Sequence, residues 1–114
     1  MSNEEQIVAA QIQELRRGSV VLACLSVLRE PRYGYSLLNV LDGAGIRVDG
    51  NTLYPLLRRL EAQGLLTSAW NTAEARPRKF YSTSDAGRRV LERLSAEWER
   101  LAADLIRLLQ EKDT

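Results

Sequence analysis

A long apolar stripe runs through the last third of the sequence, at Leu91, Leu94, Trp98, Leu101, Leu105 and Leu108. Steps of three and four residues alternate along it, which indicates one long helix with an apolar seam. A chain of 114 residues is the size of one ordinary domain, so we expect no second domain to cover that seam. Because a row of leucines with a tryptophan would otherwise lie exposed, the stripe predicts a homodimer.

The charges beside this seam disfavour a simple two-stranded coiled coil. The g positions of the heptads are acidic, and the e positions offer no opposite charge: Glu97, Asp104 and Glu111 face Ser95, Ala102 and Leu109. Ile106 and Leu109 also widen the apolar stripe beyond the seam. We therefore expect this helix to pack against several neighbours, including the N-terminal helices of a partner.

Composition excludes several classes of protein. Hydrophobic residues make up 45% of the chain and charged residues 27%, which is normal for a globular protein and excludes a wholly disordered chain. The chain has no histidine and a single cysteine, Cys24, which lies among apolar residues and is expected to be packing. We therefore expect no enzyme activity, catalytic residue, metal site or cofactor. The longest apolar run is too short to cross a bilayer, and the acidic start is unlike a secretory signal. These features predict the cytoplasm and no membrane partner.

Hydrophobic periodicity and turn residues divide the chain into six segments. Residues 4–17 form an amphipathic helix, residues 20–29 a buried helix, and residues 34–41 a short helix that ends near Gly43 and Gly45. Residues 51–63 form a helix closed by Gly64, with Asp49 and Asn51 as candidate N-caps and Pro55 in the first turn. Residues 65–70 and 79–83 form a hairpin, and Ser84 with Asp85 caps the last helix.

Two helices that meet at a glycine turn just before a hairpin are typical of a winged helix-turn-helix module. The expected fold class is mainly α with a small two-stranded β-wing (α+β), flanked by N- and C-terminal dimerisation helices. The corresponding units are residues 1–17, the DNA-binding domain 18–84, and residues 85–114.

Charge is distributed unevenly, although the net charge is only +1. Basic residues gather from residue 76 to residue 89, whereas the first fourteen residues hold three glutamates and no base. The helix over residues 51–63 also turns its polar side away from its leucines, and that side carries arginines. In such a module the second helix enters the major groove and the hairpin tip follows the phosphates, so the charge pattern favours double-stranded DNA as the partner.

Three stretches, GYSLLNVL, NTLYPLLRRLEAQGLL and RPRKFYSTSDAGRR, resemble the PadR family of bacterial winged-helix transcriptional regulators. The resemblance covers about residues 15–109. It implies a dimer in which the C-terminal helix clasps the partner, and repression of nearby genes that a small molecule relieves. The sequence departs from the family at Ser82, where a leucine is usual, so one buried strand position is expected to be more polar here.

Each candidate site residue has a structural alternative. The predicted DNA contacts are Asn51, Thr52, Tyr54, Pro55, Arg58, Arg59, Arg76, Arg78 and Lys79. Asn51 and Thr52 could instead be caps, Tyr54 could pack on the wing, and Arg58 and Arg59 could be a solvated face. Tyr33 and Tyr35 are expected in the core or a hinge, and one of Phe80 and Tyr81 is expected to be buried and the other exposed.

Trp98 has two interpretations, an interface anchor or a stacking surface for a planar aromatic effector. Leu94, Leu101 and Leu105 share its face of the last helix and belong to the same dimer or effector region. The second interpretation comes from the family resemblance. A different class of function also stays open, because winged helices serve as protein-interaction adaptors too. An adaptor, however, has no need of arginines on both the second helix and the wing.

Overall fold

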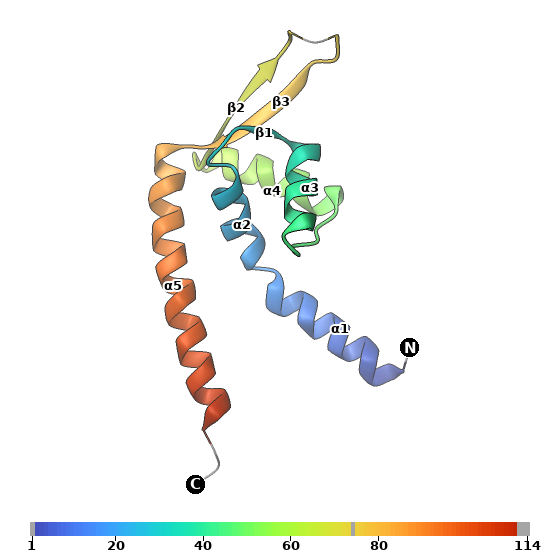
Figure 1. Cartoon of the computed structure of the whole chain (residues 1–114), viewed down its shortest axis with the longest axis vertical. Helices are drawn as coiled ribbons and strands as arrows, with labels where there is room; N and C mark the ends of the chain where they lie inside the picture. The colour runs from blue at the N-terminus through green and yellow to red at the C-terminus, as the bar shows by residue number, and fades with distance from the viewer. Residues whose placement is uncertain (1, 74, 112–114) are drawn as a thin grey trace.

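The computed structural model describes residues 2–73 and 75–111, which form five helices and three strands (Figure 1). The order is α1 (Asn3–Arg16), α2 (Ser19–Val27), β1 (Arg32–Tyr33), α3 (Gly34–Gly43), α4 (Gly50–Ala62), β2 (Leu66–Asn71), β3 (Arg78–Thr83) and α5 (Asp85–Gln110). The predicted class, mainly α with a small β-wing, is confirmed. Residues 1 and 112–114 of the predicted terminal segments, and residue 74 of the predicted wing tip, lie outside the described residues.

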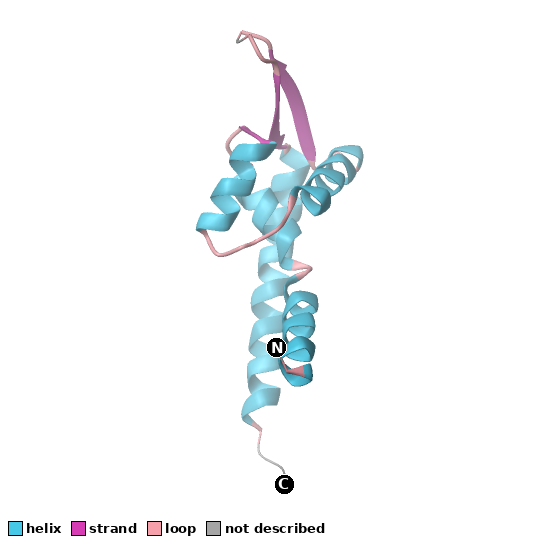
Figure 2. Ribbon diagram, turned by 90° about the vertical axis from the view of Figure 1, so that its right-hand side faces the viewer, coloured by secondary structure: helices cyan, strands magenta, loops and turns pink. Residues whose placement is uncertain are grey.

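The molecule is elongated, with extents of 64 × 37 × 22 Å. Helices α2, α3 and α4 form a body from which the β2–β3 hairpin projects on one side, whereas α1 and α5 extend on the other (Figures 1 and 2). Three surfaces are thereby separated: the hairpin, the exposed side of α4, and the two long helices.

A cluster of leucines holds the body together. The buried side chains come from α2, α3, α4 and the sheet: Cys24, Leu25, Leu28, Leu37, Leu41, Leu53, Leu56, Leu57, Leu60, Leu66 and Tyr81. Burying one leucine side chain contributes about 1.5–3 kcal/mol, so this cluster is the main source of stability. Burial also raises the pKa of the Cys24 thiol to about 12, so the cysteine is a neutral packing residue, as predicted.

The turn between α3 and α4 depends on two local features. Gly45 has φ +85°, a conformation that suits glycine, and Asp49 caps α4 by accepting a hydrogen bond of 2.9 Å from the amide of Thr52. Because Asp49 is the cap, the capping roles considered for Asn51 and Thr52 are wrong. Pro55 lies in the second turn of α4 rather than the first, since the helix begins at Gly50. The hydrogen bond that Pro55 removes would end at Asn51, which is exposed to water.

The sheet contains a third strand that the hairpin prediction lacked. Its order is β1-β3-β2, with Arg32 opposite Tyr81 and Tyr33 opposite Phe80. A strand of two residues has no periodicity to detect in a sequence, so the pattern could not indicate it. Strand β1 covers Phe80, because the rings of Tyr33 and Phe80 meet edge to face at 5.6 Å.

The aromatic expectations are therefore partly corrected. Tyr81 is buried as expected of one of the pair, but Phe80 is half-buried rather than exposed. Tyr33 lies half-buried on the sheet, whereas Tyr35 is exposed and does not belong to the core. Ser82, the departure from the family pattern, has its hydroxyl oxygen 3.2 Å from that of Thr67 across the β2–β3 ladder.

Helix α5 is firmly attached at its first turn. The Ser84 hydroxyl accepts from the amide of Gly87 and donates to the carbonyl of Gly64 at 2.6 Å. Gly87 lies so close to the carbonyl oxygen of Leu65 that a Cβ there would overlap it. Thr83, buried in the last position of β3, donates to the carbonyl of Leu25 at 2.8 Å. The start of α5 is thus tied to the turn between α4 and β2, and the end of β3 that precedes it is tied to α2.

Candidate nucleic-acid interface

The exposed side of α4 carries five of the predicted contact residues: Asn51, Thr52, Pro55, Arg58 and Arg59. Leu53, Leu56, Leu57 and Leu60 bury the opposite side of the helix. Within the described residues no carboxylate lies within 4.0 Å of the guanidinium of Arg58 or Arg59. A helix surface with unpaired arginines can donate to phosphates or to base edges in a groove.

Tyr54 has a structural role in this helix. Its ring lies over Gly34, the first residue of α3, so closely that a Cβ at Gly34 would overlap the ring. The ring also covers Gly50, where a Cβ would come within 3.1 Å. The packing interpretation of Tyr54 holds, although its partner is α3 and not the wing. The residue stays 37% exposed, so part of it faces solvent beside Asn51 and Arg58.

The three basic residues predicted for the wing differ in their surroundings. Arg76 is exposed in the loop between β2 and β3. Arg78 stacks on the Tyr33 ring with 4.5 Å between the guanidinium carbon and the ring centroid, and it is half-buried. Lys79 donates to Glu61 of α4 at 3.3 Å and is also half-buried. Arg78 and Lys79 therefore fasten the hairpin to β1 and α4, whereas Arg76 points to solvent.

Sequence reasoning missed Glu61, which connects α4 to the wing. Its carboxylate accepts hydrogen bonds from the Ser68 hydroxyl on β2 and from Lys79 on β3. The Ser68 hydrogen bond and the Lys79 charge keep the pKa of Glu61 below its usual value, although burial opposes them. Burial lowers the pKa of Lys79, but its interactions with Glu61 and Tyr81 outweigh that effect and the pKa is raised. The signal that could have identified Glu61 is its angular position around α4, which directs its side chain toward the hairpin.

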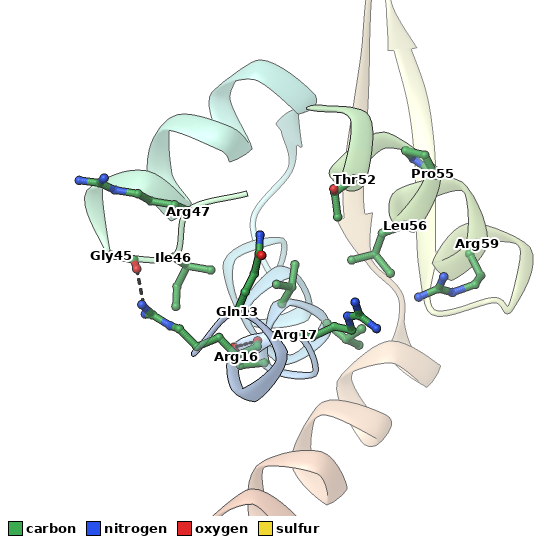
Figure 3. Close-up of a pocket in the computed structure, with 13 residues that line it drawn as sticks. Gln13, Arg16, Arg17, Gly45, Ile46, Arg47, Thr52, Pro55, Leu56 and Arg59 are labelled. Carbon is green, nitrogen blue, oxygen red and sulfur yellow. Dashed lines mark hydrogen bonds between the residues drawn. The ribbon is translucent and has the colours of Figure 1, made fainter. Parts of the chain in front are cut away.

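A cleft of about 720 Å³ lies on the other flank of α4 (Figure 3). Its walls are the α1–α2 junction, the turn after α3 and the side of α4. We call it the arginine cleft because four arginines stand around it: Arg16, Arg17, Arg47 and Arg59. Val20, Val21, Ile46 and Leu56 form a less exposed floor. The first three arginines were missed, because they lie in segments far apart in the sequence.

The second surface consists of the apolar faces of α1 and α5. On α5, Leu94, Trp98, Leu101 and Leu105 are exposed, Trp98 by 54%, and Ile106, Leu108 and Leu109 continue the patch. Helix α1 has no buried residue and exposes Ile7, Val8, Ile12 and Leu15. The two helices leave the body side by side in Figure 2 but diverge in Figure 1. Both apolar faces are thus open in the single chain.

Trp98 lines neither the arginine cleft nor a second hollow of about 490 Å³ between α2 and α5. That second hollow is lined by Ser26, Arg29, Leu91, Glu92, Ser95, Ala96 and Glu99. In residues 2–73 and 75–111, no cluster of side chains has the composition of a metal site. Within the same residues, no helix combines the length and the apolar character that crossing a bilayer requires.

Comparison with known proteins adds the family. Residues 21–93 match the model of the transcriptional regulator PadR-like family. The chain is 35% identical over 96 residues to the transcriptional regulator Rv3488 of Mycobacterium tuberculosis, an alignment that covers 83% of this chain and 90% of that protein.

Solved structures agree with this match. A PadR family transcriptional regulator from Eggerthella lenta is 48% identical with a TM-score of 0.92, covering 96% of this chain and 97% of that one. A PadR-like transcriptional regulator from Bacillus cereus is 26% identical with a TM-score of 0.77, covering 87% and 99%. Because the family model matches residues 21–93 and the fold is shared with a solved PadR family structure, this chain belongs to the PadR-like family of DNA-binding transcriptional regulators.

Proposed function

We propose that the protein is a homodimeric repressor that binds double-stranded DNA and is released from it by a small-molecule effector. The observation that carries the proposal is the exposed side of α4, where no carboxylate of residues 2–73 and 75–111 lies within 4.0 Å of Arg58 or Arg59. Residues 18–84 serve as the DNA-binding unit, and residues 1–17 and 85–114 as dimerisation segments. The site of action is the bacterial cytoplasm, where the chromosome lies.

The proposed DNA contacts follow the surfaces described above. The start of α4 enters the major groove with Asn51, Thr52, Pro55 and Arg58 toward base edges, while Arg59 and Arg76 approach phosphates. Tyr54, Arg78 and Lys79 keep their packing roles and reach the backbone only with their exposed atoms. Arginines on both α4 and the wing favour DNA over an adaptor role.

The dimer is proposed from the apolar faces of α1 and α5. Each contains at least four large apolar side chains that a second copy of the chain would cover. A twofold pairing of these helices places two copies of Trp98, Leu94, Leu101 and Leu105 in one interface. Tryptophan is enriched at such interfaces, and its flat ring also suits stacking on a planar aromatic molecule.

Repression would be relieved if an effector near Trp98 favoured a dimer in which the two α4 helices no longer match the DNA. A ligand shifts such an equilibrium only through its different affinity for the two dimer shapes. Couplings of about 1–3 kcal/mol are usual, so the release of DNA should be graded with effector concentration.

Selection of duplexes from a randomised pool by the purified protein tests the DNA-binding part. The recovered sequences should share an inverted repeat with half-sites about 10 base pairs apart or a multiple of that distance. Arg58→Ala should weaken binding to the selected duplex by about 1–3 kcal/mol, the range of one base contact. Arg100→Ala, an exposed arginine on α5, is the matched control. A pool without a common sequence, together with unchanged binding by Arg58→Ala, would refute the proposal.

A further inference from the structure

We propose that the arginine cleft holds a phosphate of the DNA backbone, on the flank of α4 opposite the wing. This inference rests on the proposed insertion of α4 into the major groove. It assigns DNA contacts to Arg17 and Arg47, two residues outside both the recognition helix and the wing.

The first argument is the position of the cleft relative to α4. Glu61 marks one flank of the helix, because it binds Ser68 and Lys79 of the hairpin. Arg59 lies about 160° away around the helix axis, since each residue turns by about 100°, and it lines the cleft together with Thr52. The wing and the cleft thus stand on the two sides of the same helix.

This arrangement fits the dimensions of a DNA duplex. A helix with its side chains is about 10–12 Å wide and the major groove is about 12 Å wide, so the two phosphate strands run close to both flanks. On one flank the wing meets a strand. On the other flank the walls of the arginine cleft are the nearest protein surface, because Thr52 and Pro55 belong both to the cleft and to the exposed side of α4.

The second argument is charge. Among the described residues that line the cleft, none is an aspartate or a glutamate, whereas four are arginines. Figure 3 shows Arg59 on the α4 wall and Arg16, Arg17 and Arg47 on the other walls. A hollow lined by charges of one sign focuses the field and attracts the opposite charge. An anion between the walls also relieves the repulsion among the guanidinium groups.

The third argument is that Arg17 and Arg47 are held only by weak, exposed ion pairs and can reorient toward a phosphate. Arg17 pairs with Glu14 at 3.3 Å and Arg47 with Asp42 at 3.6 Å, and all four side chains are more than half exposed. Exposed pairs contribute about 0–1 kcal/mol, so exchanging such a carboxylate for a phosphate costs little. A guanidinium binds phosphate through two parallel hydrogen bonds, which a surface carboxylate pair at these distances does not supply.

Arg16 has a different part in the cleft. Its guanidinium donates to the carbonyl of Gly45 at 2.9 Å and so fixes the α1–α2 junction against the turn before α4 (Figure 3). We therefore treat Arg16 as a positioning residue that keeps Arg17 and Arg47 at the edge of the groove. The test leaves Arg16 unchanged so that the shape of the cleft is preserved.

The test compares two double variants on a mixed-sequence duplex of about 30 base pairs, roughly three helical turns. The first is Arg17→Ala with Arg47→Ala. The control is Arg100→Ala with Arg107→Ala, which removes the same charge from exposed pairs on α5. Binding is measured over a series of salt concentrations. Each lost phosphate contact should flatten the slope of log K against log salt by about 0.9, so the cleft variant, which loses one phosphate, should lose about 0.9 per protomer.

In practical terms, a fourfold rise in salt should weaken the parent about 3.5-fold more than the cleft variant, per protomer. The control pair should keep the parental slope. An equal change in both variants would show an effect of net charge and would overturn the inference. An unchanged slope in the cleft variant would overturn it too, while weaker binding of the selected duplex by Arg58→Ala would leave the proposed function standing. Binding by the parent that does not depend on salt would instead refute the proposed function.

A small phosphate-bearing molecule offers the cleft the same chemical group as the DNA backbone. A second measurement therefore tests whether the cleft binds a small anion instead of DNA. Inorganic phosphate is titrated into the protein without DNA and followed by phosphorus NMR. Weak binding that is equal in parent and cleft variant is the expected result. Tight binding to the parent alone, with an unchanged salt slope on DNA, would assign the cleft to a small anion and contradict the inference.

Discussion

Replacing Leu94 and Leu101 by aspartate should convert the proposed dimer into monomers. In the single chain these leucines are 37% and 52% exposed, so pairing would cover about a third of one residue and half of the other. Full burial of a leucine contributes about 1.5–3 kcal/mol, which makes the part covered on pairing worth about 1 kcal/mol. A twofold interface holds four such leucines. Losing about 4 kcal/mol raises the dimer Kd about a thousandfold, before any cost of burying four carboxylates.

Light scattering and sedimentation over a range of concentrations measure this change. A matched control is Ala103→Asp with Gln110→Asp, which adds two carboxylates to α5 at the same seven-residue spacing but on its polar side. The control should keep the parental Kd, and circular dichroism should show that α5 stays helical in both variants.

Two results would refute the reasoning. One is a monomeric mass of the parent at micromolar concentration with its helices intact. The other is a dimer of parental stability in the variant with both leucines replaced, because the apolar face of α5 would then contribute nothing to pairing.

Three further predictions concern the wing, the α3–α4 contact and the effector. Glu61→Gln should lower the free energy of unfolding by about 0.5 kcal/mol at neutral pH. The pKa of Glu61 in the folded protein lies below the ordinary value of 4.5. The difference in unfolding free energy between the parent and Glu61→Gln, measured by urea titration, should therefore disappear as the pH falls below 4.5 and through the folded-state pKa. Gly34→Ala should cost about 1–3 kcal/mol in thermal unfolding through its clash with a tyrosine ring, whereas Gly43→Ala, with open space around it, should not destabilise. A planar aromatic dye should quench the tryptophan fluorescence of the parent protein and bind less tightly to Trp98→Ala, a variant that keeps Trp70. If the dye binds both proteins with equal affinity, Trp98 is an interface anchor alone.

Periodicity predicted the long elements of this fold well. The leucines of α4 and the heptad of α5 each repeat over several turns, so the pattern is redundant and the boundaries are within a few residues of those observed. Strand β1 contains two residues, too few for any period. Strand β1 forms because β3 offers it a free edge, which is a property of the folded sheet and not of the local sequence.

The candidate site was predicted less completely, for a reason that particular contacts make plain. Arg78 and Lys79 look like free wing charges in the sequence, but Tyr33 and Glu61 engage them from segments 45 and 18 positions away. The arginine cleft likewise joins residues from α1, the turn after α3, and α4. Helical wheels report which way a side chain points within one element and carry no information about what another element brings to meet it.

The hydrogen bonds at the first turn of α5 make that helix a lever. Its 26 residues span about 39 Å at 1.5 Å per residue, and Trp98 lies about 20 Å from the fixed end. At that radius a sideways shift of about 1 Å at Trp98 corresponds to a tilt of about 3°. Because Ser84, Thr83 and Gly87 join the fixed end to the body with little slack, the tilt turns the body as a whole. Small changes where two copies meet would therefore re-aim both recognition helices without deforming either domain.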